Sequence, residues 1–307
     1  MYRLVLEKFD KHKVNNFVNL SSLEYDDLPE VVNKKHIIWK HISSTNGAST
    51  GIHLYCNSEI VGRILLQPKL LNINGRYVAI AIATDALVHP KHRRPIGNFL
   101  SIVKKMDNMS DFDFILHTSN EASEGIYKKI LKIKNPFSLT GYITPVDLHA
   151  ISKKYSRILA LAARLVNKPY RLSLVLFCKA LKIVTELKVT DKEPNVQEFD
   201  ALCERNALHY GPEIKRSKEN LKWRFSDSPL WKGEILYIYK HIEFVGYIVI
   251  RHVKINGLEF TVLMDYSISS ELSLLEVMSI RASIIEKSIK KGDSAVFENM
   301  IHEERKI

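Results

Sequence analysis

The chain has 307 residues, of which 46% are hydrophobic and 26% charged, and its 45 Lys and Arg outnumber 34 Asp and Glu to give a net charge of +11. This globular composition excludes a chain that is disordered throughout, and the length allows two domains of ordinary size or one large one. The three cysteines are scattered without a CxxC pair, which excludes a zinc ribbon or a disulfide framework. The polar first residues and the lack of a long apolar run predict a cytoplasmic protein without integral membrane contact.

The first half of the chain has the pattern of mixed α and β structure. Short apolar runs on either side of Asn57-Ser58-Glu59 predict a β-hairpin, and a longer run rich in Ala, Ile and Val predicts a strand that ends before Pro90. Apolar residues at helical spacing predict the helices. The expected elements in chain order are a helix over 31–39, strands over 51–56, 60–67 and 77–88, a helix over 96–106, a strand over 112–117 and a helix over 121–131.

The positive charge is concentrated in one segment. Residues 151–190 hold nine Lys and Arg against one acidic residue, which is +8 of the total of +11. Apolar residues at helical spacing predict two helices, and Asn167-Lys168-Pro169 predicts a break between them. We interpret the segment as a basic helical hairpin that joins two domains. A phosphate-bearing ligand or an anionic membrane surface remains an alternative, and nucleic acid is less favoured because aromatic residues are not interleaved.

The pattern of the first half recurs after the basic segment. Strands are expected over 234–239, 243–252 and 258–267, followed by a helix over 271–291 and a short strand over 295–298. Gly62 in Ile60-Val61-Gly62-Arg63 matches Gly246 in Phe244-Val245-Gly246-Tyr247. We therefore predict a distant internal duplication. The predicted domains are residues 1–150, a linker over 151–190 and a second copy over 191–307.

The stretch from Thr84 to Asn98 carries the most informative motif. A strand ends, a short basic loop that contains a glycine follows, and a helix begins. Such a loop directs backbone N–H groups and the positive end of the helix at an anion, for which a pyrophosphate is the natural guest. Arg93 and Arg94 could add charge-assisted hydrogen bonds to phosphate oxygens.

This stretch resembles motif A of the GNAT acyltransferase superfamily. Val88-His89-Pro90-Lys91-His92-Arg93 fits the V-x-P-x-[YF]-R lead-in, whereas the glycine pattern departs from the family, because Pro95 stands where the first glycine is expected. Proline has no N–H, so one phosphate contact of the family should be missing.

Two further matches to the family follow in the expected order. Residues 120–130 resemble the N-x-A-S-x-x-x-[YF]-x-K-[LI] helix, and residues 140–147 resemble the Y-x-x-P-[LV] ending of one subgroup of tandem GNATs.

The resemblance implies an α/β (α+β) fold of tandem GNAT-like domains. Each would have a mixed, mostly antiparallel central sheet flanked by helices, and the second copy would be degenerate because no basic, glycine-bearing loop follows Tyr266-Ser267-Ile268. In this fold two central strands splay beside a β-bulge, which leaves backbone groups free to pair with the pantetheine of coenzyme A. No metal is implied. The cofactor-binding residues implied are Leu87, Val88, His89, Arg93, Arg94, Ile96, Gly97, Asn98, Asn120 and Ser123.

Acyl transfer from a thioester to an amine needs a polarised carbonyl, a base and an acid. The resemblance makes Tyr127 the residue that protonates the leaving thiolate. Asp85 is the first candidate base, because alternation along a strand points it the same way as Leu87 and because a carboxylate among apolar residues should be functional or well paired. His89 and His117 are further candidates, and transfer without a protein base is also left open.

The acceptor follows from the resemblance alone. Tandem GNATs with the Tyr-x-x-Pro ending are similar to N-acyltransferases of bacterial surface-polysaccharide (lipopolysaccharide or O-antigen) pathways, some of which acylate a dTDP-linked 3-amino-3,6-dideoxyhexose with an acetyl or short hydroxyacyl group such as 3-hydroxybutyryl. Tyr142, Trp223 and Arg224 are the candidate acceptor-binding residues. The expected partners are thus acyl-CoA and a nucleotide-linked amino sugar, without nucleic acid, and a homo-oligomer is left open. The alternatives are acylation of an amino acid, peptide or antibiotic amine, and a non-catalytic CoA-binding or nucleic-acid-binding protein.

Overall fold

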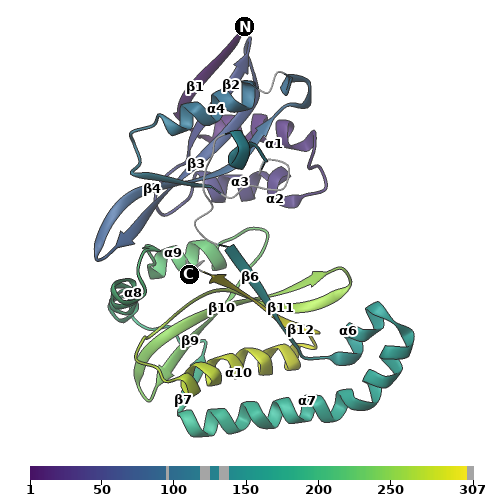
Figure 1. Ribbon diagram of the computed structural model, residues 1–307. Helices are drawn as coiled ribbons and strands as arrows, with labels where there is room; N and C mark the ends of the chain where they lie inside the picture. Colours follow the sequence, from purple (N-terminus) through teal and green to yellow (C-terminus); the bar gives the residue numbers. More distant parts are fainter. Residues whose placement is uncertain (95–96, 118–124, 131–137, 303–307) are drawn as a thin grey trace. The chain divides into compact units, whose positions relative to one another are not determined.

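A computed structural model describes residues 1–94, 97–117, 125–130 and 138–302. The chain divides into two compact units (Figure 1). The first unit comprises Met1–Ile133 and Tyr210–Lys232, and the second comprises Lys134–His209 and Gly233–Ile307. Each unit contains one six-stranded sheet with helices packed on it, which confirms the predicted class of mixed α and β structure.

The sheet of the first unit has the strand order β1-β2-β3-β4-β5, with β8 paired to β3. Its strands are β1 (Tyr2–Lys8), β2 (Thr50–Cys56), β3 (Glu59–Ile73), β4 (Arg76–Val88), β5 (Phe114–His117) and β8 (Glu213–Ile214). Every pair is antiparallel except β4 with β5, which is parallel. The mixed, mostly antiparallel sheet is therefore as predicted.

Helices cover both faces of this sheet. The helical segments of the first unit are η1 (Lys11–Lys13), α1 (Val14–Ser22), α2 (Pro29–Val32), α3 (Lys34–His41), η2 (Pro90–His92), α4 (Gly97–Asp107), η3 (Ile126–Ile130), α9 (Lys218–Leu221) and η4 (Lys222–Ser226). Ile64 and Leu66 of β3 pack with α4, whereas Leu65 packs with α1 and α3. Since side chains alternate along a strand, α4 lies on one face and α1 with α3 on the other.

The helix expected over 31–39 is divided into two. Asn33 has extended backbone dihedral angles, and its side chain accepts a hydrogen bond from the backbone N–H of His36, 3.1 Å away. Asparagine is a favoured N-cap because its oxygen satisfies an otherwise unpaired N–H of the first turn. α2 therefore ends at Val32 and α3 begins at Lys34.

The sheet of the second unit repeats the topology of the first. Its order is β6-β12-β11-β10-β9-β7. The elements of this unit are β6 (Ser138–Pro145), α6 (Leu148–Tyr155), α7 (Arg157–Thr185), β7 (Leu187–Thr190), α8 (Val196–Tyr210), β9 (Glu234–Lys240), β10 (Glu243–Ile255), β11 (Leu258–Ile268), α10 (Leu274–Lys291) and β12 (Ala295–His302). β9-β10-β11-β12 thus corresponds to β2-β3-β4-β5, as the sequence pattern predicted, and β7 and β1, which were not predicted, extend the correspondence by one strand.

The two copies also agree in local detail. Val61 is an extra residue in the pairing of β3 with β2, and Val245 is the extra residue at the same place in the pairing of β10 with β9. The carbonyl of Val61 accepts the backbone N–H of His89, and the carbonyl of Val245 accepts that of Ser269, both over 2.8 Å. Gly62 and Gly246, which follow these extra residues, are therefore equivalent in structure as they are in sequence.

The boundaries of the two units differ from those expected. β6 lies within the predicted domain 1–150 but pairs with β12 of the second sheet, and residues 210–232 belong to the first unit. A sequence pattern identifies a strand but not the strand with which it pairs. It therefore could not show that each unit is built from two separate stretches of the chain.

The predicted helix break at Asn167-Lys168-Pro169 is wrong. α7 runs through Pro169, and the turn of the hairpin lies at Ser156, which caps α7. The Tyr170 hydroxyl donates to the carbonyl of Pro145 over 2.8 Å, and the Asn167 side chain accepts the backbone N–H of Leu148 over 2.8 Å. These tertiary contacts hold the helix together through a proline, which normally costs a helix interior about 3 kcal/mol.

Candidate functional site

A β-bulge lies near the end of β4. Leu87 pairs with Arg63 and Thr84 with Leu65, so two residues of β4, Asp85 and Ala86, oppose the single residue Ile64. Asp85 has a φ of 55°, in the left-handed region that residues other than glycine adopt uncommonly. A bulge of this kind bends its strand and changes the direction of the side chains after it.

The last residues of β4 have an open backbone edge. β4 pairs with β5 from Ile80 to Ala83, and the pairing among the described residues stops there. The backbone N–H of His89 donates to β3, so alternation directs the N–H and C=O of Val88 away from β3. The Val88 carbonyl accepts a hydrogen bond from Arg93 Nε over 2.9 Å. The strand end therefore presents backbone groups with which an extended ligand could pair.

The loop after β4 leads into α4, an 11-residue helix that begins at Gly97. The Asn98 side chain donates to the carbonyl of His92 over 2.8 Å, and the Tyr2 hydroxyl contacts the His92 ring over 2.9 Å. His89 accepts the backbone N–H of Lys91 over 3.1 Å. A Cβ at Gly97 would meet no heavy atom within 4 Å. The start of α4 thus combines a tied basic loop with open space, as an anion-binding helix N-terminus requires.

The two arginines of the loop have different surroundings. Arg93 forms an ion pair with Glu24 and, through Nε, holds the Val88 carbonyl, so its guanidinium fixes the loop to the turn that follows α1 and to β4. The Arg94 side chain is exposed.

A cavity of about 320 Å³ lies beside α4 on its β1 and β2 side, away from the open edge of β4. Its lining residues include Arg3, Leu54, Gly97 and Ser101.

Asp85 is the centre of a buried polar cluster. Its Oδ2 accepts hydrogen bonds from Lys40 Nζ over 2.7 Å, His41 Nε2 over 2.9 Å and Thr84 Oγ1 over 2.8 Å. Burial by itself would raise the pKa of Asp85, but the Lys40 ammonium and the His41 ring hold that pKa well below its ordinary value. His41 is fully buried, which lowers its own pKa, and its Nδ1 contacts Ser49 Oγ over 3.0 Å. The cluster therefore pairs an ionised carboxylate with a neutral imidazole.

Asp85 reaches this cluster because of the bulge. Regular alternation from Ala83, which packs on the α4 face, would direct Asp85 to that same face. Instead Asp85 contacts α3, and Leu87 is paired with Arg63, whose guanidinium contacts α1. Asp85 and Leu87 do share a face, as expected, but it is the face covered by α1 and α3. Lys40 and His41 were not identified from the sequence, because no local signal links them to a residue about 45 positions away.

Tyr127 and His117 lie together where β4 and β5 separate. Their rings are stacked, with centroids 4.2 Å apart and an interplanar angle of 23°. His117 pairs with Ala83, the last paired residue of β4. Burial raises the pKa of Tyr127 and lowers that of His117, so at neutral pH the phenol keeps its proton and the imidazole is neutral. Within the described part of the chain, Nδ1 of His117 is buried without a hydrogen-bond partner.

The predicted acceptor-binding residues are divided between the units. Trp223 and Arg224 belong to the first unit, and Tyr142, which is half-exposed on β6, belongs to the second. The Trp223 indole is 8% exposed and stacks on Trp39, and each ring nitrogen donates to the other residue's carbonyl, over 3.2 and 2.8 Å. Lys69 Nζ lies 4.6 Å from the Trp223 ring centroid. The indole is therefore packed inside the first unit.

The remaining predicted cofactor residues, Ile96, Asn120 and Ser123, lie outside the described residues. No group of three or more His, Cys, Asp or Glu suited to a metal ion occurs in the described ranges. Among the helices described, none is both long and apolar enough to cross a membrane.

The second copy lacks the features of the β4 loop. Five residues, 269–273, separate β11 from α10. Ser273 and Glu276 form a reciprocal capping box, in which each side chain accepts the other residue's backbone N–H. The carboxylate of Glu276 therefore occupies the N-terminus of α10, where an external anion would otherwise bind.

No protein-family model and no curated protein sequence matches this chain. Solved structures do match its fold. A probable N-acyltransferase of Enterococcus faecalis V583 aligns with a TM-score of 0.66 at 10% identity, covering 99% of this chain and 67% of that one. A GCN5-related N-acetyltransferase of Anabaena variabilis aligns with a TM-score of 0.60 at 13% identity, covering 97% and 66%. Saccharomyces cerevisiae N-myristoyltransferase with bound myristoyl-CoA aligns with a TM-score of 0.52 at 14% identity, covering 96% and 76%.

The chain spans about two thirds of the length of the first two of these structures. At such low identity the likeness concerns the fold. The chain therefore has the fold of the GCN5-related N-acetyltransferases, the GNAT fold.

Proposed function

We propose that the first unit binds acyl-CoA and transfers its acyl group to an amino group of a second substrate. The observation that carries this proposal is the open edge of β4 after Ala83, next to a basic loop that enters the N-terminus of α4. The names of the similar structures, an N-acetyltransferase and an N-myristoyltransferase with bound myristoyl-CoA among them, support the same class of reaction.

Coenzyme A would occupy this edge in two parts. The pantetheine would pair with the backbone of Val88, which faces away from β3, as an added strand, and Leu87 remains a cofactor-binding residue on the resemblance alone. The pyrophosphate would accept the backbone N–H groups at Gly97 and Asn98, with the exposed Arg94 as a nearby cation. Arg93 would act indirectly, because its guanidinium already holds Glu24 and the Val88 carbonyl. His89, Ile96, Asn120 and Ser123 remain cofactor-binding residues on the resemblance alone.

The chemistry then follows from the groups near the edge. The amine nitrogen attacks the thioester carbon, a C–N bond forms, and the carbonyl oxygen gains negative charge that the Val88 N–H would stabilise. The C–S bond breaks, and Tyr127 would give its proton to the thiolate, for which its raised pKa is suitable. The neutral imidazole of His117 would take the proton that the amine loses.

Asp85 is better suited to positioning than to taking a proton. A carboxylate whose pKa lies well below its ordinary value is a weak base, and its Oδ2 already accepts three hydrogen bonds. We assign it the role of fixing the bulge to α3 through Lys40 and His41. The bulge in turn sets the direction of the Val88 backbone.

The proposed acceptor is a dTDP-linked 3-amino-3,6-dideoxyhexose, acylated with an acetyl or a short hydroxyacyl group such as 3-hydroxybutyryl. Support comes from the tandem arrangement and from the Tyr142-to-Pro145 sequence, which the structure places in β6. Tyr142 and Arg224 remain candidate contacts. Trp223 is a weaker one, because its ring would have to leave Trp39 to stack on a ligand.

Thiol release from acyl-CoA tests the proposal. The full-length chain is incubated with acetyl-CoA or 3-hydroxybutyryl-CoA and with the dTDP-amino sugar, single amino acids or short peptides. Release that requires the amino sugar supports both parts of the proposal. Release with an amino acid or peptide alone refutes the acceptor and keeps the reaction class, whereas no release and no CoA binding refutes both.

Gly97→Leu provides a matched variant for this assay. Its side chain would enter open space, so the fold should be kept while the pyrophosphate position is filled. We expect CoA binding to fall at least tenfold with unchanged thermal unfolding. The control is Ser270→Leu, an exposed position in the corresponding loop of the second copy, which should bind CoA normally.

A further inference from the structure

α7 carries an exposed apolar face along almost its whole length. Six large apolar side chains recur on it at intervals of three, four or seven residues, which places them on one side of the helix. This apolar stripe consists of Ile158, Leu161, Leu165, Leu172, Leu176 and Ile183, which are 57 to 81% exposed. From Ile158 to Ile183 the stripe extends about 38 Å at the rise of an α-helix.

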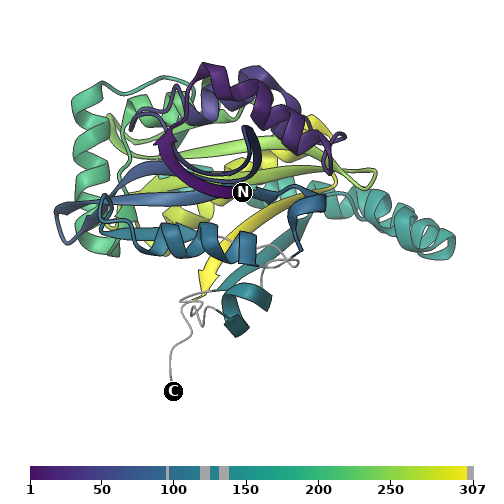
Figure 2. The same cartoon turned by 90° about the horizontal axis from the view of Figure 1, so that it is seen from above.

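The other face of α7 is already used for packing within the second unit. Cys178 and Leu181 are buried against α10, and Ala160 and Ala163 are also buried. Figures 1 and 2 show α6 and the first part of α7 extending past the end of α10. α7 therefore already has a buried face, and the apolar stripe is a second, exposed face. Single exposed leucines are common on protein surfaces, but they do not account for a face this long.

Basic side chains border the stripe on one side. Helical spacing puts Arg157, Arg164 and Lys168, all exposed, along this basic flank, with the exposed Lys179 in line with Leu161 at its edge, and α7 contains no Asp or Glu. Lys153 and Lys154 of α6 add two more exposed ammonium groups nearby. An apolar face bordered by cations is typical of helices that lie in the plane of a membrane interface.

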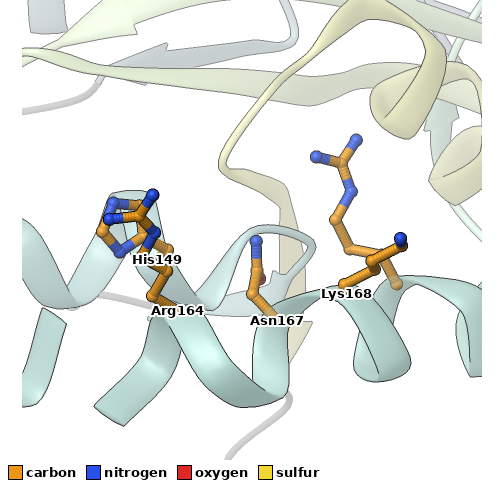
Figure 3. Close-up of a pocket in the computed structure, with 5 residues that line it drawn as sticks. His149, Arg164, Asn167 and Lys168 are labelled. Carbon is orange, nitrogen blue, oxygen red and sulfur yellow. The ribbon is translucent and has the colours of Figure 1, made fainter. Parts of the chain in front are cut away.

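A cationic cavity of about 360 Å³ opens on the same flank (Figure 3). It is lined by His149 of α6 and by Arg164, Asn167, Lys168 and Arg171 of α7. Figure 3 shows His149 and Arg164 close to each other at one end of it and Lys168 at the other. His149 Nδ1 donates to the carbonyl of Ala160 over 3.0 Å, which fixes its ring. The dimensions and the charge suit a phosphate headgroup.

Charge decides between the occupants of this face. A second copy docked with its α7 antiparallel would bring two basic flanks together, and like charges across an interface are unfavourable. An anionic bilayer offers both things that the face requires, which are an apolar layer beneath the headgroups for the stripe and negative charge for the flank. The long Lys and Arg side chains can reach the headgroups while the stripe is inserted.

We propose that α6 and α7 dock the protein on the surface of an anionic lipid membrane, with the apolar stripe inserted and the basic flank on the headgroups. This inference does not depend on the proposed acyl transfer. It assigns the basic segment a surface role without any membrane-spanning helix.

Vesicle co-sedimentation of the full-length chain tests the proposal. Vesicles of equal parts phosphatidylglycerol and phosphatidylcholine are compared with vesicles of phosphatidylcholine alone. The stripe variant Ile158→Ser/Leu165→Ser/Leu172→Ser removes three exposed apolar side chains, each expected to contribute at least about tenfold to partitioning. The control Leu208→Ser/Ile242→Ser/Leu274→Ser removes three equally exposed side chains elsewhere in the second unit.

We expect the wild type and the control to bind anionic vesicles and the stripe variant to lose binding by at least about a thousandfold. Arg164→Gln/Lys168→Gln should weaken binding about fivefold per charge, and added salt should do the same. Far-ultraviolet circular dichroism and thermal unfolding establish that each variant is folded. Equal binding by the stripe variant, or no binding by the wild type, overturns the proposal. A wild-type dimer that the stripe variant dissociates, without vesicle binding, assigns the face to a second copy instead.

Discussion

Replacing Asp85 by Asn removes one charge from the buried cluster that fixes the bulge of β4. The asparagine oxygen can still accept hydrogen bonds at the position of Oδ2, so the change is mainly the loss of the negative charge. Lys40 Nζ lies 2.7 Å from that oxygen, and His41 and Arg63 are buried close to it. Breaking a buried ion pair from one side costs about 3–5 kcal/mol. Because Lys40 is partly exposed, we expect a loss near the lower limit, about 3 kcal/mol.

Tryptophan fluorescence during urea unfolding reports on the first unit, which contains Asp85, because all three tryptophans, at positions 39, 223 and 231, lie in that unit. The matched control is Asp111→Asn, an exposed position of the same unit, which should change stability by less than about 0.5 kcal/mol. Because folding lowers the pKa of Asp85, its contribution is complete above the unfolded pKa near 4 and is lost as the pH falls toward the folded value. The difference between wild type and variant should therefore shrink on acidification below pH 4.

The same variant separates a positioning role from a catalytic one. If Asp85 positions the bulge, the folded fraction of the variant should keep acyl transfer within about tenfold of the wild type. If Asp85 is the base, transfer by the folded fraction falls by about 100-fold or more, the usual contribution of general base catalysis. A loss of transfer by about 100-fold or more in the folded fraction would refute a purely positioning role.

Four further predictions follow from particular contacts. The kcat/KM of the wild type should fall as the pH drops below 6.5, because the imidazole of His117 must be neutral to accept a proton. This fall should be absent from the pH profile of His117→Gln. Tyr127→Phe should slow turnover without weakening CoA affinity, and equal turnover would remove its role as the acid. Gly246→Ala should destabilise the protein by about 1–3 kcal/mol, because its Cβ would lie 2.7 Å from the Ser267 carbonyl oxygen, and by more than Gly62→Ala, whose Cβ would meet side chains at 3.2 to 3.3 Å. Ser273→Ala should cost about 1 kcal/mol in thermal unfolding through loss of the capping box, and no loss would contradict that assignment.

The sequence predicted the features that depend on neighbouring residues. The order of strands and helices along each copy, the basic loop before α4 and the equivalence of Gly62 with Gly246 follow from runs, turns and motifs that lie close together in the chain. The lack of a basic, glycine-bearing loop before α10 was visible for the same reason. Its capping box by Ser273 and Glu276 explains how that helix end is satisfied without a ligand.

The features that were missed depend on distant residues. Lys40 and His41 meet Asp85 across about 45 positions, and Trp223 meets Trp39 across 184. β6 joins a sheet whose other strands begin more than 40 residues later. α7 continues through Pro169 because Tyr170 and Asn167 bind the start of the hairpin, a tertiary effect that outweighs the local preference to break.

The most direct test of the account is a calorimetric titration of acetyl-CoA into the full-length chain. Of the two equivalent helix starts in the described part of the chain, that of α4 follows a basic loop, whereas that of α10 is occupied by Glu276. The account therefore predicts saturable binding of one acetyl-CoA per chain, lost in Gly97→Leu and kept in Ser270→Leu. Two molecules per chain, binding that Gly97→Leu does not affect, or no binding at all would contradict it.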